Sequence, residues 1–542
     1  MNQDTSGGAG RRPAPGQARN LTIGIVGAGV MGRGIAQVMA QAKARVLLHD
    51  AAPQAAAQAV DSIRQVWARL EDKGRMSAED VGENLSRLEA VAGLADFSGC
   101  DVVIEAIVER LDAKTSLFVE LEQIVAEDAI LATNTSSLSV TAIAAACRFP
   151  ARVAGLHFFN PVPLMRIVEI IGGARTARHT VERLQALVAA TSHTGVEVLD
   201  TPGFLVNHAG RGYTTEALRV VQEGVAEFSG VDLIMREQVR FSTGGFKLGP
   251  FELLDLTGLD VSQAVMESIY RQFYEEPRFR PSVIGAQRAA ARLFGRKTGE
   301  GFYVYPAGGA GGTSPAAMAA TAPVVPPSAA SCGDGPRDAT PVFISEEAQA
   351  PSLRPLVQSL GGHVVSSADA AAQDGLVLIA PLGEDASSVA ARQGLPAHRT
   401  IAIDTLFDPA VAGCRRRSLM PTVATDPAAL QAAAALFAAD GVAVSILRDS
   451  SGFVAQRILA LIVSIGCEIA QQRIARPADI DLAVRSGLGY PLGPLAMGDE
   501  IGPRRILRIL QAIHANTGDP RYRPGSWLRR RALLGLSLLV ED

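Results

Sequence analysis

The chain has 542 residues, which predicts roughly three or four domains at about 150 residues each and excludes a single hydrophobic core. Its 51 basic and 55 acidic side chains give a formal charge of −4, so neither a nucleic acid nor a membrane is expected as a partner. The five cysteines are widely spaced, which argues against disulfides and a zinc site and favours a reducing compartment. We therefore expect a cytoplasmic protein with no metal site.

The first part of the chain has the pattern of an α/β domain. Residues 1–20 have neither an apolar signal core nor a spanning segment and are predicted to be a disordered tail. Residues 21–200 alternate longer helical patterns with short apolar runs such as "LTIGIVGAG", "ARVLLHD" and "CDVVIEAI". This alternation predicts βα units and a mainly parallel sheet of the Rossmann type. Residues 201–305 have a helical pattern and predict an all-α second domain.

The second part of the chain repeats this organisation. Residues 306–338 are rich in Gly, Ala, Pro and Ser and predict a flexible linker. Residues 339–447 alternate strand-like and helical runs without a G-x-G-x-x-G, which predicts a degenerate Rossmann-like domain. In residues 448–542, "DSSGFVAQRILALIVSIGCEIAQQR" from Asp449 matches "DTPGFLVNHAGRGYTTEALRVVQEG" from Asp200. We therefore predict a second copy of the all-α domain.

A glycine-rich turn points to a dinucleotide. Gly27, Gly29 and Gly32 follow a predicted buried strand and open a helix, where they permit a tight turn and close approach of a pyrophosphate. A structural βα turn is the alternative interpretation. Asp50 ends the next strand, where its carboxylate can accept a hydrogen bond from the adenosine ribose and repels the 2′-phosphate of NADP. NAD is the expected cofactor, bound by this turn with Val30 and Met31.

Polar residues at the ends of later elements are candidates for catalysis. His157 ends an apolar strand, and Glu169 lies on the next strand, so a turn between them can bring imidazole and carboxylate together. Such a pair makes a general base for an alcohol proton, although a core histidine and a surface glutamate are the alternative. Ser136 and Asn207 can hold a substrate oxygen or can be helix caps.

Six ordered motifs between residues 21 and 305 resemble the L-3-hydroxyacyl-CoA dehydrogenase family. They are "GAGVMGRGIA", "VIEAIVERLDAK", "ATNTSSLSV", "GLHFFNPVPLMRIVEI", "DTPGFLVNH" and "GPFELLDLTGLD". Residues 340–542 resemble the second half of the long bacterial forms, some of which belong to phenylacetate-type catabolism. The resemblance implies NAD-dependent oxidation of a 3-hydroxyacyl-CoA, with 3-hydroxyadipyl-CoA and 3-hydroxybutyryl-CoA as the two candidate substrates.

The resemblance also implies roles for single residues. His157 is the expected general base, Glu169 orients it, and Ser136 and Asn207 complete the catalytic set. The positions that match cofactor contacts of the family are Glu109, Lys114, Asn160 and Lys297, and Lys73 falls near a lysine that meets the coenzyme A phosphates.

Two departures from the family pattern could bear on acyl specificity. His208 stands where the family usually has arginine, and Lys247 interrupts the usual G-[FY]-P-x-G-P run. A basic side chain near the domain junction could attract a substrate carboxylate, although a solvated surface residue is the simpler interpretation.

The repeat leads to further expectations. Gln456 stands where Asn207 stands in the first copy, so only the first half is expected to be catalytic. We expect a homodimer or an internal pseudo-dimer through the duplicated helical domain. A dehydrogenase of a free hydroxy or sugar acid and a non-catalytic NAD-binding sensor remain as alternative functions.

Overall fold

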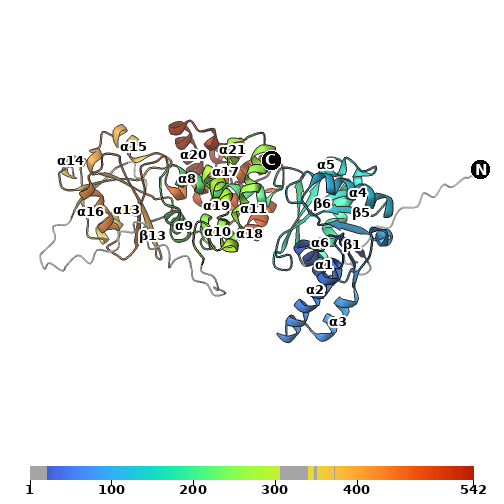
Figure 1. The fold of residues 1–542 in the computed structure, drawn as a ribbon. Coiled ribbons are helices and arrows are strands. Elements are labelled where there is room, and N and C mark those ends of the chain that lie inside the picture. The colour runs from blue at the N-terminus through green and yellow to red at the C-terminus, as the bar shows by residue number, and fades with distance from the viewer. Residues whose placement is uncertain (1–20, 306–339, 347–350, 372) are drawn as a thin grey trace, which may run out of the picture. The chain divides into compact units, whose positions relative to one another are not determined.

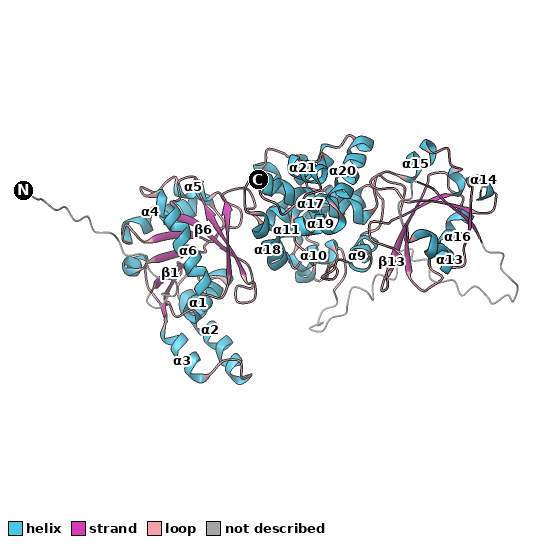
Figure 2. Cartoon of the chain, turned by 180° about the vertical axis from the view of Figure 1, so that it is seen from behind, coloured by secondary structure: helices cyan, strands magenta, loops and turns pink. Residues whose placement is uncertain are grey.

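The computed structural model describes residues 21–305, 340–346, 351–371 and 373–542, so the predicted tail and linker lie outside the described residues. The chain forms two compact units, Met1–Phe204 and Leu205–Asp542 (Figure 1). Both units contain a sheet, and the second also contains a wholly helical body (Figure 2).

The first unit is built on an eight-stranded sheet with the order β3-β2-β1-β4-β5-β6-β7-β8. All neighbouring strands are parallel except β6 and β7, which are antiparallel. The strands are β1 (Thr22–Val26), β2 (Arg45–His49), β3 (Leu88–Ala90), β4 (Val102–Glu105), β5 (Ile130–Thr133), β6 (Val153–Phe158), β7 (Ile167–Gly172) and β8 (Thr194–Leu199). The apolar runs of the central strands are buried, as expected for a parallel sheet covered on both faces.

Helices of the first unit follow the strands as βα units. They are α1 (Val30–Gln41), α2 (Ala55–Asp72), α3 (Ala78–Ser86), α4 (Leu111–Ile124), α5 (Val140–Ala144) and α6 (Arg178–Ala190), with the 3-10 turns η1 (Leu94–Gly99) and η2 (Pro150–Arg152). Strands β3 and β8 are absent from the apolar runs that we singled out in the sequence. They are the two edge strands, and they expose part of their side chains, so neither has a continuous apolar run.

The second unit contains two helical groups from distant parts of the sequence. The first group is α7 (Val206–Ala209), α8 (Arg211–Gln222), α9 (Phe228–Glu237), α10 (Pro250–Thr257), α11 (Leu259–Gln272) and α12 (Val283–Ala290), with η3 (Pro277–Phe279) and η4 (Arg296–Thr298). The second is α17 (Val454–Gln471), α18 (Pro477–Leu488), α19 (Pro494–Ile501), α20 (Pro503–Thr517) and α21 (Ser526–Leu534), with η8 (Pro520–Tyr522). Helices α8 and α17 pack side by side (Figure 1).

Helix α17 is apolar over 18 residues, and among the described residues it alone is long and apolar enough to cross a membrane. Within the unit, 89% of this stretch is buried. Its neighbours are α8, α19, α20 and α21, so it is the central core helix of the helical body.

A second sheet completes this unit, with the order β10-β9-β11-β12-β13-β14. Its strands are β9 (Pro341–Ile344), β10 (His363–Val365), β11 (Leu376–Ile379), β12 (Thr400–Ile403), β13 (Arg416–Pro421) and β14 (Ala443–Ile446). Its helices are α13 (Leu353–Ser359), α14 (Ala368–Ala371), α15 (Ala386–Arg392) and α16 (Pro427–Phe437), with η7 (Ala397–Arg399). Only β12 and β13 pair antiparallel, as β6 and β7 do in the first sheet. The predicted fold class, with two Rossmann-type sheets and two all-α groups, is confirmed.

Aspartate caps recur at matching places in the two halves. Asp200 accepts hydrogen bonds from the backbone at the start of α5, and Asp449 does so at the start of α15. Asp232 likewise caps α10, and Asp481 caps α19. Each carboxylate satisfies amide groups that have no partner within the helix.

These caps give a prediction for pH. Burial raises the pKa of Asp232 to about 8. A carboxyl group whose pKa is higher in the folded chain binds its proton more tightly there, so its contribution to the free energy of unfolding is lost as pH rises from about 4 to about 8. We expect the melting temperature of the wild type to fall relative to Asp232→Asn across this range. For Asp481→Asn, the melting temperature of the wild type should fall relative to the variant only up to about pH 6, because burial raises the pKa of Asp481 only to about 6. A difference in melting temperature between the wild type and either variant that does not depend on pH would contradict the raised pKa of that aspartate.

Candidate active site

The glycine turn joins β1 to α1 and can accommodate a pyrophosphate. Gly27 has a φ of +104°, and a Cβ atom at Gly32 would lie 1.8 Å from the carbonyl oxygen of Gly27. A Cβ atom at Gly29 would meet no atom within 4 Å. No side chain of the described residues caps α1 at Gly29, so its first amide groups remain open to an anion.

Asp50 lies directly after β2 and is fixed beside this turn. Its Oδ2 accepts a hydrogen bond from the amide of Ala28 at 2.7 Å, and its Oδ1 accepts one from Ala52 at 2.8 Å. Strands β1 and β2 are parallel neighbours, so their carboxyl ends meet at one edge of the sheet. Adjacent to the glycine turn, this carboxylate has the location expected of a ribose ligand.

His157 and Glu169 form a buried pair at the same edge. They are direct partners in the antiparallel register of β6 and β7, and Nδ1 of His157 lies 2.6 Å from Oε2 of Glu169. The side chain of His157 is 6% exposed and that of Glu169 is fully buried. The predicted contact is confirmed. With Nδ1 engaged by a carboxylate, Nε2 is the nitrogen available to a substrate proton.

Glu109 organises the loop that carries Ser136. Its Oε1 accepts hydrogen bonds from Thr135 Oγ1 at 2.6 Å, from the amide of Ser136 at 2.9 Å and from Ser137 Oγ at 2.9 Å. Burial alone would raise the pKa of Glu109, but the Thr135 hydrogen bond and the charge of Lys114 outweigh it and lower that pKa. Glu109 is thus an ionised anchor for the loop that follows β5.

Lys114 lies between two carboxylates and is 1% exposed. Its Nζ is 2.5 Å from Oε1 of Glu105 and 3.2 Å from Oε2 of Glu109. Glu105 is fully buried at the end of β4 and also accepts hydrogen bonds from Thr133 Oγ1 and the amide of Ile107. Glu105 was not among the predicted site residues, although an acidic residue at the end of the apolar run "VVIE" indicated a buried carboxylate at the end of a strand.

The remaining predicted site residues are spread over both units. Asn160 is exposed beyond the end of β6, and Lys73 is exposed directly after α2. Asn207 lies on α7 of the second unit, and its carbonyl oxygen accepts a hydrogen bond from Arg211 Nε at 2.8 Å. Lys297, also in the second unit, pairs with Asp260 at the surface. Their contacts with cofactor and substrate stay predictions.

The two departures from the family pattern differ in exposure. His208 is 1% exposed and packs against the rings of Phe273 and Phe279, with centroid distances of 4.9 and 5.0 Å. The idea that His208 is a basic group for a substrate carboxylate is therefore wrong, because its surroundings are the aromatic core. Lys247 is exposed and stays available for that role.

These features define a class of protein. A Rossmann-type sheet with a glycine turn, an acidic residue after the next strand and a buried His–Glu pair at the same edge are the features of an NAD-dependent dehydrogenase.

Comparisons with known proteins agree with this class. The domain family described as "3-hydroxyacyl-CoA dehydrogenase, NAD binding domain" matches residues 22–201. The family described as "3-hydroxyacyl-CoA dehydrogenase, C-terminal domain" matches twice, at residues 203–305 and 452–537. The chain belongs to the 3-hydroxyacyl-CoA dehydrogenase family and is an NAD-dependent oxidoreductase.

Among its relatives, the 3-hydroxyadipyl-CoA dehydrogenase of Escherichia coli is 35% identical over 95% of this chain and 98% of its own length. A probable 3-hydroxybutyryl-CoA dehydrogenase of Deinococcus radiodurans is 39% identical over 53% of this chain and 100% of its own length. The crystal structure of an Escherichia coli 3-hydroxybutyryl-CoA dehydrogenase matches with a TM-score of 0.77 and 33% identity, covering 95% of this chain and 98% of that one.

Proposed function

We propose that the chain oxidises an L-3-hydroxyacyl-CoA to the 3-oxoacyl-CoA, with His157 as the general base. The buried His157–Glu169 pair, at the sheet edge that also holds the glycine turn, is the observation that carries this proposal. The family of the chain and the names of its relatives support the substrate class.

The proposed chemistry follows from the arrangement of this pair. Glu169 holds Nδ1 of His157, so that Nε2 takes the proton of the C3 hydroxyl. NAD, when bound, would supply the acceptor for the hydride of C3. The charge of Glu169 then stabilises the imidazolium that His157 becomes. Ser136 and Asn207 hold the substrate oxygen, where hydrogen bonds stabilise developing charge. The residues that would hold NAD are the glycine turn with Val30 and Met31, and Asp50, Glu109, Lys114, Asn160 and Lys297. Lys73 would meet coenzyme A.

The experiment is to measure NADH formation by the purified chain with 3-hydroxyadipyl-CoA and with 3-hydroxybutyryl-CoA. Relatives named for each substrate cover nearly the whole chain, so we expect turnover of at least one thioester and compare kcat/KM. If the adipyl thioester is preferred, Lys247→Ala should lower that preference without changing kcat/KM for the butyryl thioester, because only the adipyl chain carries an extra carboxylate.

Two results would redirect the proposal. Turnover of a free 3-hydroxy acid or sugar acid, with none of the thioesters, would favour the alternative dehydrogenase. NAD binding without turnover of either substrate class would favour the NAD-binding sensor.

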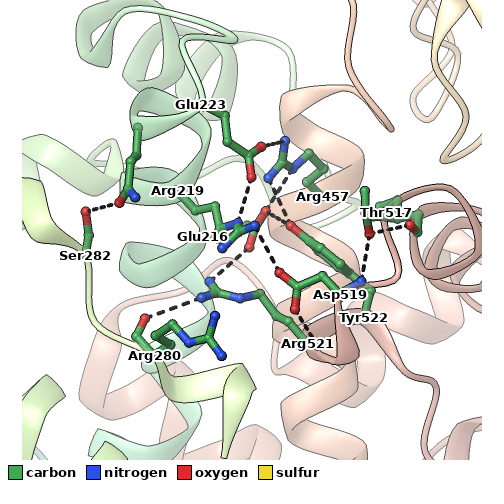
Figure 3. Close-up of polar contacts among 12 residues, drawn as sticks. Glu216, Arg219, Glu223, Arg280, Ser282, Arg457, Thr517, Asp519, Arg521 and Tyr522 are labelled. Atoms are coloured by element: carbon green, nitrogen blue, oxygen red, sulfur yellow. Dashed lines mark hydrogen bonds and ion pairs between the residues drawn. The ribbon is translucent and has the colours of Figure 1, made fainter.

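We further propose that the chain is an internal pseudo-dimer through its two helical copies. Support comes from reciprocal contacts between them. Arg278 Nη2 donates to the carbonyl oxygen of Arg523 at 2.8 Å. In the same way, Arg521 Nη2 donates to the carbonyl oxygen of Arg280 at 3.4 Å (Figure 3). Such reciprocity is a property of two-fold interfaces. Association of whole chains as a homodimer is compatible with this pairing.

The proposed location is the cytoplasm, with no nucleic-acid or membrane partner. The four cysteines that the structure describes, Cys100, Cys147, Cys414 and Cys467, are free thiols, which suits a reducing compartment.

A further inference from the structure

The second half of the chain repeats the first in the register of its strands. In the first half Thr176 Oγ1 donates a hydrogen bond to the carbonyl oxygen of Val153 at 2.6 Å. In the second half Thr425 Oγ1 donates one to the carbonyl oxygen of Thr400 at 2.8 Å. Thr176 follows β7 and contacts the first residue of β6, and Thr425 follows β13 and contacts the first residue of β12. The two contacts are therefore equivalent, and they align the two halves residue by residue.

The counterparts of His157 and Glu169 in the second half follow from this alignment. Four residues after Val153 and Thr400 lie His157 and Asp404, respectively. Seven residues before Thr176 and Thr425 lie Glu169 and Ser418. The amide of Asp404 donates to the carbonyl oxygen of Ser418 at 3.0 Å, so these two residues also face each other across antiparallel strands.

The counterpart positions Asp404, Ser418 and Gln456 form a closed polar group with Gln238 of the first half. We call these four residues the glutamine latch. Gln238 directly follows α9 of the first helical group; its Nε2 donates to Asp404 Oδ2 at 2.7 Å, and its Oε1 accepts from Ser418 Oγ at 2.5 Å. Gln456, the counterpart of Asn207, donates from Nε2 to Asp404 Oδ1 at 2.9 Å. All four side chains are buried. The latch joins the second sheet to both helical groups.

The next residue, Arg457, belongs to an arginine cluster between the two helical groups (Figure 3). Its Nε donates to Oε1 of the fully buried Glu216 at 2.8 Å, and its Nη1 donates to Glu223 at 2.7 Å. Tyr522 and Arg521 also contact Glu216, at 2.6 and 3.5 Å. Glu216 and Glu223, on α8 and directly after it, thus pair with arginines of the second helical group, and Arg219 of α8 pairs in the opposite sense with Asp519 at 3.0 Å.

The cluster is linked to a residue of the proposed catalytic set. Glu216 lies on α8, which begins at Arg211, and Arg211 donates to the backbone carbonyl of Asn207. A side chain that fixes α8 therefore also fixes the backbone that carries Asn207.

We infer that the second half acts in the reaction as an internal scaffold, in which the glutamine latch and Arg457 position the helical group that carries Asn207. Gln456 and Arg457 are positioning residues, and their first-half counterparts are Asn207 and His208. This inference rests on the proposed function, because Asn207 owes its role to that proposal.

The test uses the full chain with the double substitution Glu216→Gln and Arg457→Met. The double substitution removes both charges of the buried ion pair between these two side chains. Arg521 loses Glu216 but keeps its hydrogen bond to the carbonyl oxygen of Arg280, so the variant should fold. We expect kcat for the thioester to fall roughly 10- to 100-fold, because small displacements of a substrate-positioning group slow the reaction this much. The dissociation constant for NAD should change much less than kcat, since the proposed cofactor residues other than Lys297 belong to the first unit. The single variant Arg457→Lys should recover part of the activity, because lysine keeps the charge but loses the fork of donors.

The matched control is Glu267→Gln with Arg271→Met, an exposed pair one turn apart on α11 of the same helical group. Its kcat and NAD affinity should equal those of the wild type. Wild-type kcat in the cluster variant, or an equal loss of NAD affinity and kcat, would overturn the inference.

Hydrogen exchange separates failure of this inference from failure of the proposed function. Backbone amides of residues 206–222 should exchange faster in the cluster variant than in the wild type, whether or not a thioester is turned over. Unchanged exchange there would overturn the scaffold even if the enzyme is active. Faster exchange in a protein that oxidises neither thioester would overturn the proposed function and leave the scaffold standing.

Discussion

Replacing His157 with alanine is expected to lower kcat by roughly 10²- to 10⁴-fold, the range attributed to a positioned general base. The imidazole is the basic group paired with buried Glu169 at the cofactor edge of the sheet, and alanine leaves no group to take the C3 hydroxyl proton. NAD affinity should be unchanged, because the glycine turn and Asp50 follow β1 and β2, whereas His157 lies on β6. Initial rates of NADH formation and NAD titrations measure both quantities.

A second histidine of the same unit provides the control. His193 is also buried, but its ring nitrogens contact the carbonyl oxygens of Thr191 and Val162, both at 2.9 Å. His193→Ala should lower the melting temperature and keep most of kcat. If His157→Ala kept near wild-type activity, His157 would not be the base. The second half would not explain that result, because its counterpart Asp404 is enclosed in the glutamine latch.

Two alanine substitutions in the glycine turn should both weaken NAD binding, but only one of them should destabilise the fold. Gly32→Ala places a Cβ atom 1.8 Å from the Gly27 carbonyl, so the turn must deform, and we expect loss of NAD binding together with a large drop in melting temperature. Gly29→Ala meets no protein atom within 4 Å, so the fold should stay intact. We expect it to weaken NAD binding by at least roughly tenfold, because the methyl group occupies space that the pyrophosphate approaches.

Thermal melting and NAD titration of both variants provide the measurement. Wild-type NAD affinity in Gly29→Ala would contradict the assignment of this turn to the pyrophosphate. A fully folded Gly32→Ala protein that binds NAD normally would contradict the close packing of α1 on β1.

Much of the first unit could be predicted because its signals are local. Buried parallel strands have continuous apolar runs, and the glycine turn and Asp50 lie at fixed distances from them. The His157–Glu169 contact could also be predicted, because a short connection between neighbouring strands restricts the register to a few choices. The edge strands β3 and β8 could not, since partial exposure removes the apolar run.

Burial and contacts that depend on tertiary packing could not be predicted from the sequence. The pattern of charges gave no sign that Lys114 is buried between Glu105 and Glu109, because burial of a lysine depends on partners that tertiary structure supplies. The burial of His208, for which we considered a role toward a substrate carboxylate or a solvated surface position, could not be predicted for the same reason: its aromatic neighbours come from a segment more than sixty residues away. The latch could not be foreseen either, since Gln238 and Asp404 are 166 positions apart.

The paired caps Asp200 and Asp449 are a feature that the two halves of the chain share. After the duplication both halves still needed the same amide groups satisfied at the start of α5 and α15, and both kept the same aspartate for it. The residues at the position of His157 differ, since the second half has Asp404 there. Helix capping and the proposed catalysis therefore depend on separate positions of the repeat. The caps identify the second half as a copy of the first, whereas the catalytic residues alone would not.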